Sequence, residues 1–82
     1  MLKPEKIEIE QIYIPTKRRQ TLDDEKVETL AEDILENGCR MPIQVRQGKG
    51  RYVLVEGLHR LEALRALGEE KVESFIVSAR KI

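Results

Sequence analysis

The stretch "RYVLVEGLHRLEALRALG", residues 51–68, constrains the fold most, because its hydrophobic period changes at a single glycine. Up to Gly57 it is a short β-rich apolar run, and beyond Gly57 the leucines recur at intervals of three, which favours a helix. We therefore predict a strand that turns directly into a helix, with Gly68 closing that helix. The only histidine of the chain, His59, stands beside Arg60 in the first turn.

A second helix is predicted over residues 23–36. Thr21 followed by Asp24 has the spacing of a capping box, and the acidic residues 23–25 suit the positive end of a helix dipole. Asn37-Gly38 supplies a stop signal. The apolar residues of this segment fall on one stripe at helical spacing, and they are Val27, Leu30, Ala31, Ile34 and Leu35.

Four β-rich segments accompany the helices, at residues 7–14, 41–47, 51–57 and 71–77. The first alternates apolar and polar side chains with a slip near Gln11, which predicts one edge strand with a bulge or bend that ends at Pro15. The second and third are separated by Gly-Lys-Gly, a turn signal, so we expect them to pair as a hairpin. Residues 16–20, between the first strand and the helix, are polar and basic and are expected to form a connecting arm.

Length and composition predict one α+β domain over residues 1–82, with a small mixed sheet covered by two main helices. Lys plus Arg and Asp plus Glu both number 15, so any site for a polyanion must be local. A lone cysteine, Cys39, offers neither an internal disulfide nor a metal-ligand spacing, and we expect no metal site from the protein alone. No segment has the pattern of a membrane span or a signal peptide, so a cytoplasmic protein is expected.

The junction at Gly57 has two interpretations from local physics. The first N–H groups of a helix have no partner within it and attract anions, and the missing Cβ of glycine allows a phosphate to approach. His59 and Arg60 would then add side-chain donors. In the plainer interpretation Gly57 only makes a tight turn, His59 is solvated or caps a helix, and Arg60 pairs with Glu56 or Glu62.

Three segments, "DDEKVETLAEDILENG", "MPIQV" and "RYVLVEGLHRLEALRALGEEKV", resemble the ParB/sulfiredoxin-like superfamily in order and spacing, and the similarity covers roughly residues 7–77. The resemblance implies a compact α+β domain, of the ParB N-terminal type, that binds a nucleoside triphosphate. It places the phosphates at the turn formed by Gly57, Leu58, His59 and Arg60. It places the nucleoside at Lys26 and Thr29, with Asp33 at a matching position that we interpret as solvated, and the basic arm at Arg18 and Arg19.

Leu58 separates this chain from both branches of the superfamily. Sulfiredoxins carry a nucleophilic cysteine at that position, and leucine offers no thiolate, so the sulfiredoxin reaction is not expected. The ParB branch usually has Gly-Glu-Arg-Arg at the turn, and the loss of its glutamate leaves Glu56 as the one weak catalytic candidate. An exposed Glu56 that balances Arg60 is the simpler interpretation.

The resemblance implies three functional hypotheses. The first is a stand-alone domain that binds ATP or CTP with Mg²⁺ and acts as a bacterial accessory protein in DNA partition or regulation, with DNA or a DNA-binding protein as a further partner. The second is a small nucleotide-dependent enzyme, such as an NTPase, kinase or nuclease. The third is a protein-interaction module with a decayed site. A homodimer through residues 7–14 and an exposed Leu-rich helix is a further expectation.

Overall fold

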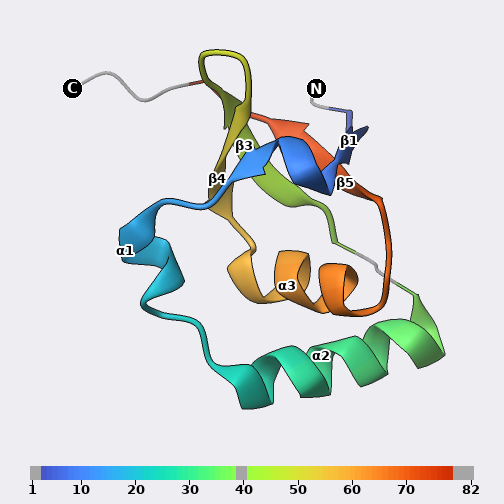
Figure 1. Ribbon diagram of the computed structural model, residues 1–82. Coiled ribbons are helices and arrows are strands. Elements are labelled where there is room, and N and C mark those ends of the chain that lie inside the picture. Colours follow the sequence, from blue (N-terminus) through green and yellow to red (C-terminus); the bar gives the residue numbers. More distant parts are fainter. Residues whose placement is uncertain (1–2, 39–40, 79–82) are drawn as a thin grey trace.

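The computed structural model describes residues 3–38 and 41–78, which form a curled five-stranded mixed sheet with helices on its concave side (Figure 1). This architecture confirms the predicted α+β class. In chain order the elements are β1 (Glu5–Glu8), the 3-10 turn η1 (Ile9–Gln11), β2 (Ile12–Tyr13), α1 (Thr16–Arg19), α2 (Asp24–Asn37), β3 (Ile43–Gln47), β4 (Tyr52–Glu56), α3 (Leu58–Ala66) and β5 (Lys71–Ile76).

The sheet has the strand order β1-β5-β3-β4-β2. β3 and β4 pair antiparallel, with Val45 opposite Leu54, and the Gly48 N–H donates to the Arg51 carbonyl across the turn at 2.8 Å. The predicted hairpin is therefore confirmed. β5 runs parallel to β3, and β2 runs parallel to β4, so this hairpin lies in the middle of the sheet.

The segment predicted as one edge strand, residues 7–14, forms two strands at opposite edges of the sheet, and that prediction is wrong. β1 pairs antiparallel with β5, and after one turn of 3-10 helix β2 pairs with β4. The slip near Gln11 marks this turn, in which the Ile9 N–H donates to the Glu70 carbonyl at 2.9 Å. Because three residues connect the two edges, the sheet has to curl around the helix that it faces.

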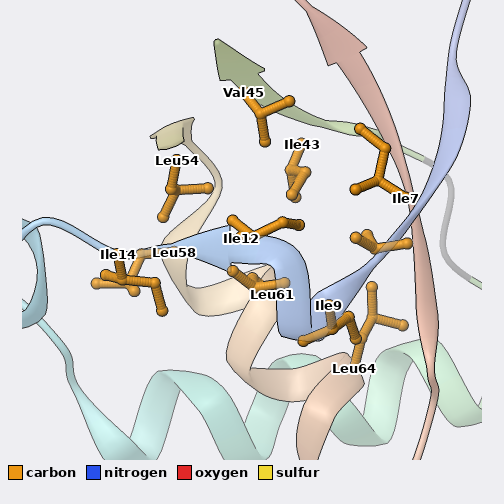
Figure 2. Close-up of a cluster of buried hydrophobic side chains, with 11 residues drawn as sticks. Ile7, Ile9, Ile12, Ile14, Ile43, Val45, Leu54, Leu58, Leu61 and Leu64 are labelled. Atoms are coloured by element: carbon orange, nitrogen blue, oxygen red, sulfur yellow. The ribbon is translucent and has the colours of Figure 1, made fainter. Parts of the chain in front are cut away.

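That helix is α3, whose leucines fill the curl (Figure 2). Leu58, Leu61 and Leu64 are buried among apolar side chains of the sheet, and Leu61 is 0% exposed. Gly68, with φ of +84°, closes α3 as predicted. The expectation of an exposed Leu-rich helix is therefore wrong, because burying these side chains removes apolar surface from water. The facing residues in the same cluster are Ile7, Ile9, Ile12, Ile14, Ile43, Val45, Leu54 and Val72.

α2 covers α3 from outside and has no buried residue of its own. Its predicted stripe holds for Val27, Leu30, Ala31 and Ile34, which are half-buried. Leu35 is 75% exposed, so its place on that stripe is wrong. A helix that packs against one other helix buries a narrower stripe than one lying on a sheet.

The N-cap of α2 is Asp23, and the predicted capping box starting at Thr21 is wrong. The Asp23 carboxylate accepts from the N–H groups of Glu25 at 3.0 Å and of Lys26 at 3.4 Å. The Thr21 hydroxyl instead donates to the Arg18 carbonyl at 2.7 Å, because residues 16–19 are themselves helical. The expected connecting arm is thus the short helix α1, which Pro15 precedes as the N-cap with its preset φ.

Gly57 joins β4 to α3 with a φ of +106°. A Cβ built on it would lie 2.7 Å from Ile43 Cγ2, at the floor of the core. The missing Cβ therefore makes room for Ile43 rather than for a phosphate, and both the dihedral and the contact require glycine.

Gly57→Ala should lower the free energy of unfolding by about 2–4 kcal/mol, because left-handed strain and overpacking add. Gly50→Ala is the matched control, since Gly50 has a φ of +68° with no atom within 4 Å of its missing Cβ, and should cost about 1 kcal/mol. Denaturant unfolding measures both values. Equal losses would show that the Ile43 contact is unimportant.

Candidate functional site

α3 begins directly after the carboxyl end of β4, with only Gly57 between them. The Leu61 N–H donates to the Gly57 carbonyl at 2.9 Å, so the N–H groups of Leu58, His59 and Arg60 precede the first intrahelical bond. The Leu58 side chain is buried in the core, which leaves only its backbone for a ligand. The four residues predicted to hold phosphate thus form one turn, with three successive N–H groups at the positive end of a helix.

A hollow of about 370 Å³ lies over this turn, and we call it the turn hollow. Arg18 and Arg60 bring two positive charges to it and Glu56 brings one negative charge, so its lining has a net positive charge. The hollow is lined by Arg18, Thr21, Leu30, Glu56, Gly57, Leu58, His59 and Arg60.

Glu56 pairs with Arg18 across the turn hollow, with 3.4 Å between the carboxylate and the guanidinium. The expected Glu56–Arg60 pair is therefore not formed. Glu62, the other expected partner of Arg60, pairs with Arg65 at 3.6 Å. Within residues 3–38 and 41–78, Arg60 has no ion pair and remains available for an anion. Arg19 does not line the turn hollow, so of the two predicted arm residues only Arg18 reaches it.

His59 links the two helices that border the site. Its Nε2 accepts a hydrogen bond of 3.0 Å from the Asp23 N–H, one of the free donors at the start of α2. Accepting at Nε2 requires the neutral ring with its hydrogen on Nδ1, so one ring nitrogen is committed to the protein. His59 therefore holds the N-terminus of α2 beside the N-terminus of α3, and only Nδ1 can donate to a ligand.

A second hollow, of about 710 Å³ and wide open to solvent, follows the exposed side of α2, and we call it the α2 hollow. It contains the predicted nucleoside residues Lys26 and Thr29. Asp33 lines it too and accepts from the Asn37 amide at 2.9 Å, one turn further along the helix. The full lining is Asp23, Glu25, Lys26, Thr29, Leu30, Asp33 and His59.

Leu30 and His59 line both hollows, so the predicted phosphate residues and the predicted nucleoside residues adjoin. Thr21 and Leu30 line the turn hollow although no sequence pattern predicts them as site residues. Thr21 was interpreted as a helix cap and Leu30 as part of the apolar stripe, and no local pattern marks either as facing a cavity. Their position depends on how α1 and α2 pack around α3.

A third hollow, of about 420 Å³, lies between the C-terminal half of α2 and β5, away from the turn. Its apolar lining includes Ile34, Leu64 and Val72, and no sequence pattern pointed to it. Among the residues that the structure describes, no three His, Cys, Asp or Glu side chains are grouped closely enough to hold a metal ion. Cys39 lies outside the described residues. None of the described helices is both long enough and apolar enough to cross a bilayer.

Residues 2–81 match the ParB N-terminal domain family. A probable chromosome-partitioning protein ParB of Campylobacter jejuni is 38% identical over 71 residues, which are 85% of this chain and 26% of that protein. The chain therefore spans about a quarter of the length of this relative.

Two solved structures have the same fold over 96% of this chain. A C-terminally truncated chromosome-partitioning protein ParB of Caulobacter crescentus, complexed with CTP-γ-S, is 28% identical with a TM-score of 0.82, and 46% of it is covered. Sulfiredoxin from Arabidopsis thaliana is 30% identical with a TM-score of 0.79, and 86% of it is covered. Both branches named by the sequence resemblance are thus structural neighbours of this chain.

His59→Phe tests the structural role of His59, which is its hydrogen bond to the N-terminus of α2. Loss of the Nε2 acceptor leaves the Asp23 N–H without a protein partner, and we expect a loss of about 0.5–1 kcal/mol in unfolding free energy together with faster hydrogen exchange at the Asp23 amide. Arg60→Ala, at the next position, removes no bond among the described residues and should stay within about 0.5 kcal/mol of wild type. Unchanged exchange at Asp23 in His59→Phe would contradict the link between the helices.

Proposed function

This chain belongs to the ParB N-terminal domain family, and we propose that it binds a nucleoside triphosphate, with the phosphates at the Gly57–Arg60 turn. The observation that carries the proposal is that the turn hollow and the α2 hollow share two lining residues and therefore adjoin. A triphosphate and a nucleoside are joined covalently, so their sites must adjoin, and His59 and Leu30 line both hollows.

The charges of the two hollows support one orientation of the ligand. The turn hollow combines three free N–H groups with Arg18 and Arg60, which suits phosphate oxygens. The α2 hollow has the carboxylates of Asp23, Glu25 and Asp33 against the single ammonium of Lys26. Carboxylates repel phosphate but accept hydrogen bonds from ribose hydroxyls and exocyclic amines. The nucleoside therefore belongs on α2, beside Lys26 and Thr29.

Two observations bear on the nucleotide. The ParB neighbour from C. crescentus is complexed with CTP-γ-S, which supports CTP as the ligand, and ATP stays the alternative that the family resemblance predicts. With no group of metal-binding side chains among the described residues, Mg²⁺ would be held chiefly by the phosphates and by water, as is usual for this ion. A catalytic role for Glu56 stays a prediction, since its carboxylate is paired with Arg18.

At the biological level, the relative from C. jejuni carries the name of a chromosome-partitioning protein. We propose that this chain serves as the nucleotide-responsive part of a DNA-partition or regulatory system, with a DNA-binding protein or DNA itself as its partner. Nucleotide binding would then change the surface that this partner contacts through α1 and α2, because Arg18 and His59 connect these two helices to the turn.

A thermal-shift experiment with each common nucleoside triphosphate at 1 mM, with and without Mg²⁺, tests the proposal. A ligand present at 100 times its Kd stabilises the native state by about 2.7 kcal/mol, which for a domain of this size raises Tm by roughly 10 °C or more. Arg60→Gln should abolish the rise. Arg65→Gln is the matched control, because Arg65 lies on the same helix and pairs with Glu62 outside both hollows.

Tripolyphosphate separates the two subsites. It should stabilise wild type and Lys26→Gln to a similar extent, because Lys26 lines only the α2 hollow, whereas Lys26→Gln should weaken the response to the intact nucleotide. No shift of wild type with any nucleotide would overturn the proposal, and so would a response that Arg60→Gln retains in full.

A further inference from the structure

Six basic residues lie on the two chain segments that carry β2, α1 and the β3–β4 hairpin, and among the described residues only one of the six, Arg18, is paired with an acidic residue, Glu56. They come from two segments, residues 12–22 and 44–55, that contain no Asp or Glu at all. The remainder of the chain holds nine basic and 15 acidic residues, so a chain of zero net charge is strongly polarised. The six are Lys17, Arg18, Arg19, Arg46, Lys49 and Arg51.

Strand pairing brings the two segments together. β2 runs alongside β4, with Tyr13 opposite Val53. Arg46 of β3 is opposite Val53 from the other side, so Tyr13, Val53 and Arg46 form a row on one face of the sheet. Val53 is 7% exposed yet is not part of the core cluster under α3, so this row lies on the convex face, where Figure 1 shows no helix.

Long polar side chains cover that face. The Arg51 guanidinium lies 3.9 Å from the centroid of the Tyr13 ring, and Tyr13 is 39% exposed. Lys49 stands at the tip of the hairpin, which projects from the end of the molecule opposite α2 (Figure 1). Within residues 3–38 and 41–78, neither Arg46 nor Lys49 forms an ion pair. Their charges are therefore not neutralised by the protein.

We call Tyr13, Arg46, Lys49 and Arg51 on this face, together with the exposed Lys17 and Arg19 of α1 near the Glu56 end of β4, the basic strip. From this strip we propose that the domain binds the sugar-phosphate backbone of a nucleic acid. β4 extends over about 17 Å at 3.3 Å per residue, so the hairpin and α1 at its two ends can contact several phosphates of one strand. An arginine stacked on an exposed tyrosine adds a surface on which a sugar or base packs. With one aromatic and no inserted element, the contact is independent of base sequence.

A second copy of the chain is the competing occupant, because α2 is acidic, with Asp24, Glu25, Glu28, Glu32, Asp33 and Glu36 against Lys26. The carboxylates of α2 from a second copy would neutralise the positive charges of the strip as phosphates do. They would make no particular use of the stacked Tyr13–Arg51 pair, and for this reason we favour nucleic acid. The proposal rests on the proposed function only for the DNA partner whose binding surface it names. It does not depend on nucleotide binding, since no residue of the basic strip lines either hollow.

Fluorescence anisotropy with a labelled 20-base-pair duplex and a labelled 20-nucleotide single strand, at 50 and 150 mM KCl without nucleotide, tests the strip. The double variant Lys49→Gln/Arg51→Gln should bind both probes at least tenfold more weakly at 50 mM, and its slope of log K against log salt should be smaller by about 2. Lys17→Gln/Arg19→Gln, on exposed positions of α1, should weaken binding as well. A loss confined to the duplex, or to the single strand, would still support the strip, as a site for that form of backbone alone.

Lys6→Gln/Lys71→Gln is the matched control, because it removes the same charge from exposed positions on β1 and β5, beyond the strip. It should bind within twofold of wild type. Equal losses in this control and in Lys49→Gln/Arg51→Gln would overturn the proposal, and so would absence of wild-type binding at micromolar protein in 50 mM KCl. Self-association in sedimentation that Lys49→Gln/Arg51→Gln removes, without any nucleic-acid binding, would assign the strip to the acidic helix of a second copy and overturn it too.

Discussion

The close approach of Gly57 to Ile43 is the contact on which the rest of the molecule depends. At this position the chain leaves β4 with a positive φ and starts α3 at once, and a Cβ would lie 2.7 Å from Ile43 Cγ2. Because the turn is so tight, α3 begins against the sheet and its leucines fill the curl that β1 and β2 close. The same turn leaves the first N–H groups of α3 facing outward at the end of a strand. The packing that stabilises the core thus also creates the anion-attracting end of the candidate site.

His59 fixes the position of α2 relative to that turn. Through its bond to the Asp23 N–H it sets the start of α2 next to the start of α3, and the two hollows differ in charge because different helices line them. Arginines border the turn hollow and carboxylates border the α2 hollow. A ligand with an anionic end and a neutral, hydrogen-bonding end matches this arrangement, and a nucleotide is such a ligand. The core, the link between the helices and the division of charge therefore follow from one glycine turn and one histidine.

Much of this architecture was predictable from sequence, and the failures have physical causes. The strand–glycine–helix junction and the β3–β4 hairpin depend on local periodicity and turn chemistry, which sequence records directly. Over residues 7–14, one bent strand and two strands joined by a turn require nearly the same alternation of apolar and polar residues. Only the pairing of β1 with β5 and of β2 with β4 distinguishes the two arrangements. Thr21 and Asp23 both suit an N-cap, and the helicity of α1 decides between them. The partners of Glu56 and His59 lie 36 or more residues away along the chain, where spacing carries no information.

A nuclear magnetic resonance titration tests the central claim that one ligand spans both helix ends. In a ¹H–¹⁵N spectrum of the ¹⁵N-labelled chain, a slowly hydrolysed triphosphate should shift the amides of Leu58, His59 and Arg60 together with those of Lys26 and Thr29, with one common affinity. Such a result would show that the backbone groups proposed to bind the phosphates and the helix face proposed to bind the nucleoside respond to the same binding event. Shifts confined to the hairpin, or to the hollow beside Ile34 and Val72, would contradict the account.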